Sequence, residues 1–124
     1  MTQRMVTAVR NPHVDVLGHC TGRIVAGRGR PESQFDHKVV FEACAASGTA
    51  VEVNSRPDRL DPREELIRLA ASAGCMFSID SDAHAPGQLC WLINGCRQAA
   101  GAGISPASVV NSMPLQALVD WARP

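Results

Sequence analysis

The sequence is poor in aromatic residues and carries no net charge. It contains no tyrosine, three phenylalanines and two tryptophans, and its 12 basic side chains balance its 12 acidic ones. Proteins that bind single-stranded nucleic acid usually combine a basic surface with aromatic stacking platforms, so this composition does not favour that function. A neutral chain also has no overall field that would draw it to an anionic membrane. Any binding of anions must therefore be local.

Disulfide, thiolate and targeting patterns are also absent. The five cysteines are odd in number and include no CxxC pair, which argues against a disulfide framework and against a thiolate zinc site. The N-terminus lacks the apolar run of a signal peptide, and no stretch approaches the ~20 apolar residues that cross a bilayer. We therefore expect a cytoplasmic protein with reduced thiols and no membrane segment.

The common nucleotide-binding and hydrolase motifs are missing as well. The sequence has no GxxxxGK(S/T), no GxSxG, no HExxH and no GxGxxG after a strand, which excludes the usual P-loop, serine hydrolase, zincin and Rossmann interpretations. Cys20 adjoins His19, but neighbours on an extended segment point to opposite sides, so this pair is poorly placed for nucleophilic catalysis. Metal chemistry is the better interpretation.

What the sequence does contain is an alternation of helical and strand patterns. The patterns predict helices over 3–10, 36–47, 62–73, 89–100 and 114–121, and strands over 14–18, 49–53, 75–79 and, weakly, 109–110. Asp61-Pro62 is expected to cap the third helix, with proline in its first turn. A chain of 124 residues with 45% hydrophobic content can bury a core,. We expect one α/β domain of parallel strands with outer helices, as an open sheet or as part of a barrel.

Polar side chains follow three of the expected strands: His19 the first, Asn54 the second, and Asp80, Asp82 and His84 the third. Loops and ligands meet at the carboxyl ends of parallel strands. Asp82 and His84 lie two residues apart and can point to one side of an extended segment, which suits a cation. The alternatives are a capping aspartate beside a surface histidine, and a structural role for His19; the position after a strand shifts the balance toward a metal site.

Three arginines follow the first two strands. Arg23 lies in the loop after His19, whereas Arg56 and Arg59 follow Asn54. Guanidinium groups bind phosphate through paired hydrogen bonds, so these side chains are candidates for holding a phosphate group. The alternative is that they form ion pairs with nearby carboxylates such as Glu52, Asp58, Asp61 and Glu64.

Three segments, in order, resemble the PHP (polymerase and histidinol phosphatase) family. They are VDVLGHCTGR, VEVNSRPDRLDP and SIDSDAHAPGQL, and the closing VVNSMPLQALVDWA also looks like the family's last strand and helix. The likeness is to the PHP region of bacterial family X DNA polymerases and to similar stand-alone phosphatases. It covers nearly the whole chain.

The resemblance implies a distorted barrel of seven βα units that hydrolyses phosphate esters with zinc, manganese or iron ions. Residues 1–124 would form its C-terminal part, with parallel strands and outer helices. His19, Asp82 and His84 fall on metal-ligand positions, and no residue is assigned as catalytic. The substrate would be a phosphate-ester small molecule or a nucleic-acid end.

The chain departs from the family pattern in two ways. Cys20 stands where proline is usual, and the HxH motif that begins PHP domains does not occur. Three ligands are too few for a multinuclear metal cluster, so we expect an incomplete site and no activity from this chain alone. The missing N-terminal half, or a second copy at an open strand edge, is the expected partner. The alternative function is an inactive PHP remnant that acts as a binding or structural module.

Overall fold

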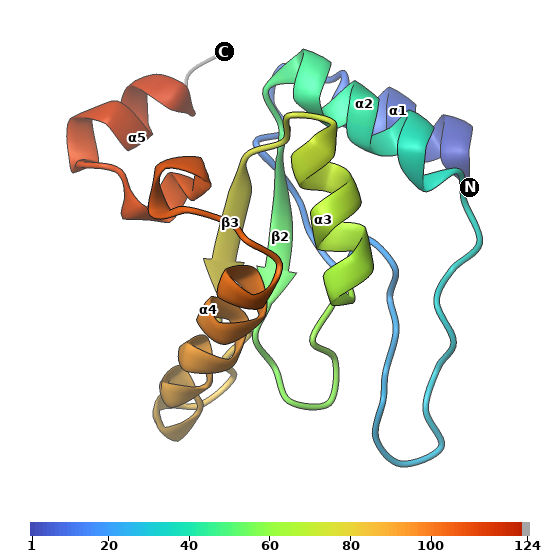
Figure 1. Ribbon diagram of the computed structural model, residues 1–124, viewed down its shortest axis with the longest axis vertical. Coiled ribbons are helices and arrows are strands. Elements are labelled where there is room, and N and C mark those ends of the chain that lie inside the picture. Colours follow the sequence, from blue (N-terminus) through green and yellow to red (C-terminus); the bar gives the residue numbers. More distant parts are fainter. Residues whose placement is uncertain (123–124) are drawn as a thin grey trace.

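A three-stranded parallel sheet forms the centre of the computed structural model, which describes residues 1–122 (Figure 1). The strands are β1 (Val16–Leu17), β2 (Ala50–Asn54) and β3 (Phe77–Asp80), in the order β1-β2-β3. Val16 pairs with Ala50, and the β2–β3 register runs from Val51 opposite Phe77 to Asn54 opposite Asp80. The predicted parallel α/β arrangement is confirmed. The seven-unit barrel stays a prediction, because residues 1–122 contribute three strands.

The first two helices lie together on one side of the sheet. α1 (Thr2–Val9) packs against α2 (His37–Ser47). The Asp36 carboxylate accepts a hydrogen bond from the Val39 N–H at 3.1 Å, so it caps α2 as the sequence predicted,. Gly48 ends this helix in the left-handed conformation, with φ of 74°, which glycine adopts without steric cost,.

The predicted start of the third helix is wrong. α3 runs over Glu64–Ser72 and its N-cap is Arg63, whose side chain makes no capping hydrogen bond. Asp61 does not cap this helix, because its buried carboxylate accepts hydrogen bonds from Thr21 and Gly22 instead. A long-range contact has displaced the local one.

The C-terminal third is helical and irregular. It contains η1 (Pro86–Trp91), α4 (Leu92–Gly101), η2 (Pro106–Ser108), η3 (Val110–Ser112) and α5 (Leu115–Trp121), so the helix predicted over 89–100 begins with a 3-10 turn. The strand predicted at 109–110 is wrong, since only a single bridge joins Val109 to Phe77. The Asn111 amide accepts from the Ile79 N–H at 3.1 Å and donates to the Ile79 carbonyl at 2.6 Å. The Asn111 side chain therefore bonds the backbone groups of Ile79 that a fourth strand would pair with.

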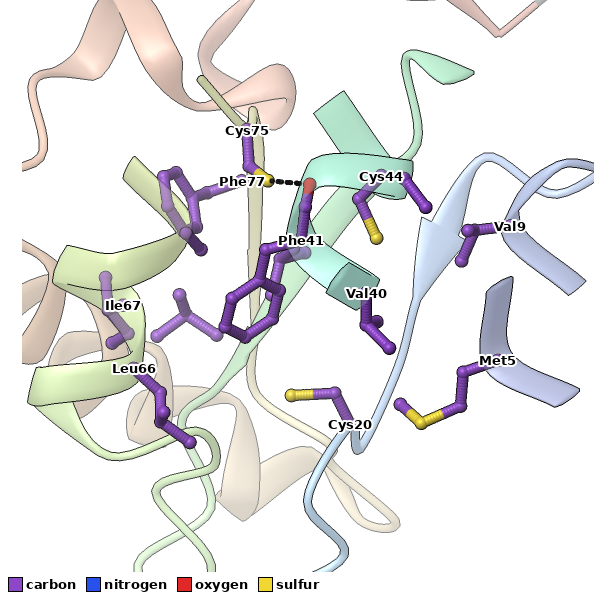
Figure 2. Close-up of a cluster of buried hydrophobic side chains, with 14 of the residues drawn as sticks. Met5, Val9, Cys20, Val40, Phe41, Cys44, Leu66, Ile67, Cys75 and Phe77 are labelled. Atoms are coloured by element: carbon purple, nitrogen blue, oxygen red, sulfur yellow. Dashed lines mark hydrogen bonds between the residues drawn. The ribbon is translucent and has the colours of Figure 1, made fainter. Parts of the chain in front are cut away.

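The main core lies between the sheet and the helices α2 and α3 (Figure 2). Phe41, Phe77 and Ile67 are its largest fully buried apolar side chains. Burial raises the pKa of the Cys44 thiol to about 12, with a smaller contribution from Cys75. Burial also raises the pKa of Cys75 to about 11. These thiols are protonated at neutral pH.

Among the described residues, no helix combines the length and the apolar character needed to cross a membrane. The cytoplasmic location stays a prediction.

Candidate functional site

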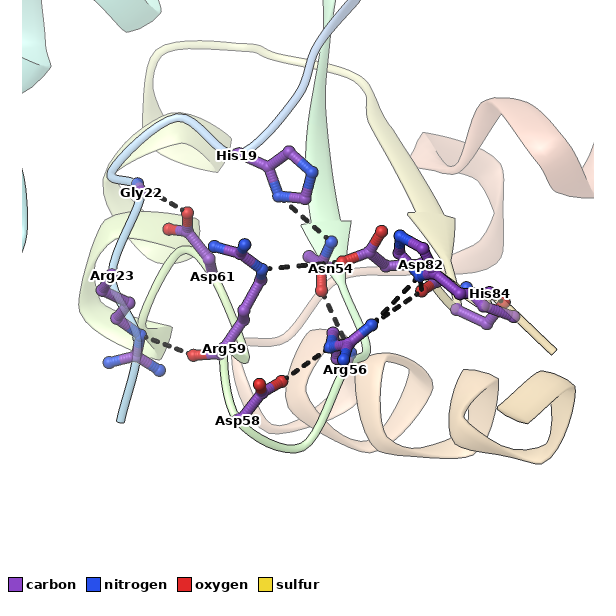
Figure 3. A network of polar contacts seen from close by, with 12 residues as sticks. His19, Gly22, Arg23, Asn54, Arg56, Asp58, Arg59, Asp61, Asp82 and His84 are labelled. Atoms are coloured by element: carbon purple, nitrogen blue, oxygen red, sulfur yellow. Dashed lines mark hydrogen bonds and ion pairs between the residues drawn. The ribbon is translucent and has the colours of Figure 1, made fainter. Parts of the chain in front are cut away.

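The loops that follow the three strands meet at the carboxyl ends of these strands. We call this end of the sheet the rim (Figure 3). His19 follows β1, Asn54 ends β2, and Asp82 and His84 follow β3. Parallel pairing places these strand ends side by side,. The structure therefore brings the polar side chains of three loops together at the rim. Their roles stay predictions.

His19 is held by the two polar side chains of β2. Its backbone N–H donates to Glu52 Oε2 at 2.5 Å, and its ring Nδ1 lies 3.3 Å from Asn54 Nδ2. The His19 backbone is left-handed, with φ of 47°. A non-glycine residue in this region costs about 1–3 kcal/mol, so the surrounding contacts must hold it there. The imidazole remains partly exposed, and its Nε2 makes no hydrogen bond to the described chain.

Glu52 is a site residue that our sequence interpretation missed. It was expected only as an ion-pair partner for an arginine, but it is buried in the sheet and contacts His19 and Asn54. Burial, together with the negative charge and hydrogen bond of Glu52, raises the pKa of Asp80 to about 7. The period-two alternation of β2, which places Glu52 and Asn54 on one face, was the signal for this pair.

Cys20 lies on the opposite side from this site. Its side chain is buried in the core, and burial, with smaller contributions from Asp61 and Glu52, raises the pKa of its thiol well above the ordinary value. The sulfur that replaces the family's usual proline is therefore a protonated core group. It is not a candidate for metal binding at the rim.

The loop after β3 is anchored to the arginines. Asp82 has a left-handed backbone, with φ of 51°, and its Oδ2 lies 3.6 Å from Arg59 Nε. The Asp82 carbonyl lies 2.8 Å from His84 Nδ1, and Arg56 Nη1 lies 3.1 Å from the same ring atom. Both Arg56 and Arg59 therefore reach the rim and do not lie on the outer helical layer.

Arg56 has a second set of contacts. Its Nε lies 2.9 Å from Asp58 Oδ1, and its guanidinium carbon lies 5.3 Å from the centre of the Trp91 ring. The ion pair and the cation–π contact hold the guanidinium in one orientation. A preorganised arginine at a rim loses little conformational entropy when it binds an anion.

Arg23 is placed differently. Its Nε donates to the Arg59 carbonyl at 2.9 Å and its Nη2 donates to the Leu60 carbonyl, while Nη1 lies 3.9 Å from Glu32 Oε1. These donors are committed to the backbone of the neighbouring loop. A phosphate-binding role for Arg23 stays a prediction.

The donors at the rim do not form a metal centre by themselves. Within residues 1–122, no three His, Cys, Asp or Glu side chains are grouped closely enough to hold an ion. A cation already stands beside Asp82, namely the Arg59 guanidinium. The rim residues of the described chain therefore do not fit the metal ions that the family resemblance implies. Further ligands would be needed to bind such an ion.

Known proteins similar to this chain include a polymerase and several phosphatases. The match to the DNA polymerase/3'-5' exonuclease PolX of Bacillus subtilis is 38% identical over 82 residues and covers 66% of this chain and 14% of that protein. A probable phosphatase of Vibrio atlanticus is 30% identical over 90 residues, covering 67% of this chain and 33% of the relative. A probable phosphatase of Syntrophotalea carbinolica is 28% identical over 116 residues, covering 89% and 45%.

No family model matches the chain. The chain spans less than half the length of each of these relatives. The predicted resemblance is nonetheless confirmed, and the chain is a homologue of part of PolX and of these probable phosphatases.

Proposed function

We propose that this chain is a segment of a phosphoesterase and that its rim binds the phosphate group of the substrate. The observation that carries the proposal is the meeting of Arg56 and Arg59 with two histidines at the carboxyl ends of parallel strands. Such guanidinium groups form strong, charge-assisted hydrogen bonds to phosphate oxygens. The relatives, a DNA polymerase/3'-5' exonuclease and several probable phosphatases, support the same chemical class.

The hydrogen bonds of Asn54 support an anion in particular. Asn54 Oδ1 accepts from the Arg56 N–H at 3.1 Å, which directs the Nδ2 donor toward His19 Nδ1. An Nδ1 that accepts leaves the proton of the neutral ring on Nε2, which then acts as a donor. A donor at Nε2 suits a phosphate oxygen, whereas a metal ion would require the opposite tautomer.

Metal dependence is a further part of the proposal. His19, Asp82 and His84 would become ligands of zinc, manganese or iron only if further groups completed the site, the Arg59–Asp82 pair opened and His19 took the tautomer protonated at Nδ1. Such ions would supply an activated water for hydrolysis. The substrate is proposed to be a phosphate-ester small molecule or a nucleic-acid end.

Phosphate titration of the labelled chain, followed by NMR of the arginine Nε–H and histidine ring signals, tests the proposal. Orthophosphate should shift the signals of Arg59 and His19, and Arg59→Ala should weaken binding by about 10-fold, as loss of a charge-assisted hydrogen bond predicts. Arg97→Ala is the matched control, because this exposed arginine lies on α4 and forms no ion pair with residues 1–122. An unchanged spectrum at millimolar phosphate would overturn the proposal.

We also expect little or no phosphatase turnover from the chain alone with added zinc or manganese. The reason is the lack of a three-donor group among the described residues. Assay on a generic phosphate monoester measures this directly. Robust turnover by the monomer, lost in both Asp82→Ala and His84→Ala, would show that the present residues suffice.

The open edge of the sheet is proposed to pair with another segment. β1 has a strand neighbour on one side only among the described residues, and Val16 is 37% exposed. Unpaired strand edges favour association. Sedimentation analysis should therefore show self-association of the isolated chain, and a strictly monomeric chain would contradict this.

A further inference from the structure

Asp61 is a fully buried carboxylate that pairs with no cation in the described chain. It accepts one hydrogen bond from the Thr21 hydroxyl at 2.5 Å and another from the Gly22 N–H at 2.9 Å. Burying a charge without an ion pair costs free energy unless hydrogen bonds compensate for it. The carboxylate therefore depends on these two donors, and they depend on it,.

The two donors come from the loop that carries His19, two and three residues after it. The acceptor belongs to the loop that carries Arg59, two residues after that arginine. One carboxylate thus joins the loop after β1 to the loop after β2. The Asp61 carbonyl also accepts from the Asn54 N–H at 2.9 Å, which fixes the carboxylate relative to the end of β2.

Arg23 forms a second connection between the same loops. Its hydrogen bonds to the carbonyls of Arg59 and Leu60 run from the first loop to the second, in parallel with those of Asp61. Both loops contain a left-handed non-glycine residue near this connection, at His19 with φ of 47° and at Leu60 with φ of 46°. Strained conformations of this kind persist only where surrounding contacts enforce them.

We propose that Asp61 is a positioning residue that sets the distance between His19 and Arg59 at the rim. It acts through Thr21 and Gly22 and touches no substrate itself. A shift of about 1 Å between groups that bind one ligand is enough to weaken binding or catalysis severely. The significance of this distance for phosphate rests on the proposed function, but the positioning itself does not.

The test compares Thr21→Val with Thr21→Ser. Valine has nearly the shape of threonine but no hydroxyl, so it removes the hydrogen bond to Asp61, whereas serine keeps it. Each chain is labelled with nitrogen-15, and the His19 ring and Arg59 Nε–H signals are recorded under conditions where circular dichroism shows full folding. We expect both signals to move in Thr21→Val and to stay near their wild-type positions in Thr21→Ser.

Core signals serve as the internal control. Phe77 should not shift in either variant, because it lies in the core at the start of β3, whereas the rim is at the other end of this strand. If Thr21→Val is merely less stable, with His19 and Arg59 signals unchanged in the folded state, Asp61 has only a structural role and the proposal is overturned. The same holds if Thr21→Ser moves them as far as Thr21→Val.

Asp61→Asn provides a second variant in case Thr21→Val does not fold. It keeps the shape of the side chain but replaces one of the two acceptor oxygens that bond Thr21 and Gly22 with an NH2 donor,. It should therefore also move the His19 and Arg59 signals, and unchanged signals in the folded chain would overturn the proposal.

Orthophosphate titration then separates the two proposals. We expect Thr21→Val to bind at least about 10-fold more weakly than wild type, as loss of supporting contacts typically does. A wild-type chain that binds no phosphate, but whose signals respond to Thr21→Val, would refute the proposed function alone.

Discussion

Gly95 is the position where a single added methyl group should test the packing behind the rim. This glycine lies in α4, and a Cβ there would stand 2.1 Å from Ser55 Oγ and 2.9 Å from Ile79 Cγ2. Ser55 follows β2 directly and Ile79 belongs to β3. Both contacts are too close, so Gly95→Ala must push α4 away from the sheet or force its neighbours to move.

The expected magnitude follows from two opposing terms. Overpacking of a close-packed site costs about 1–3 kcal/mol, whereas replacing glycine by alanine inside a helix gains about 0.5–1 kcal/mol. We therefore expect Gly95→Ala to lower the free energy of unfolding by about 1–2 kcal/mol. At this chain length the melting temperature should fall by roughly 4 °C for each kcal/mol.

Urea unfolding followed by circular dichroism measures the effect, with an unchanged m-value showing that the native surface is preserved. Gly101→Ala is the matched control on the same helix. Its Cβ would meet only the Glu64 carboxylate, at 3.3–3.5 Å, and this flexible side chain can move. The control should be neutral or slightly stabilising. A Gly95→Ala chain as stable as wild type would refute the packing argument.

Two further predictions concern buried groups. Ellman's reagent should modify the exposed Cys90 and Cys96 in the native chain and all five thiols in urea, because burial protects the other three and raises their pKa; rapid native reaction of five thiols would contradict the described core. Thr49→Val should cost about 1–3 kcal/mol, since it removes the buried hydroxyl whose single O–H is shared between the Val9 and Val14 carbonyls, each 3.0 Å from Oγ1,. Urea unfolding checks this, with Thr49→Ser as control, and equal losses in both variants would argue against the hydrogen bonds.

Local signals predicted the helices and the parallel order of the strands. Asp36 and Gly48 mark the two ends of α2, and both could be predicted because capping depends on residues within one turn of the helix end,. The parallel order followed from the alternation of helices and strands, since a helix between two strands returns the chain to the end of the sheet where the first strand began,. These features need no information from distant residues.

The errors arose where a distant residue competes with a local one. Asp61 has the sequence context of a helix cap, but Thr21 and Gly22 approach it from 39 or more residues away. The strand predicted at 109–110 fails because the Asn111 side chain occupies hydrogen-bonding groups of Ile79. Neither partner can be inferred from the neighbouring sequence.

The middle strand shows why the site residues were only partly predictable. Every residue of β2 is buried, so it lacks the contrast between an apolar and an exposed face that identifies a site. Val51 and Val53 belong to the core, whereas Glu52 and Asn54 alternate with them and hold His19. Buried polar residues in a central strand cost free energy unless their hydrogen bonds are made. Those of Glu52 and Asn54 converge on one strained histidine, so β2 contributes to the geometry of the rim as well as to the core.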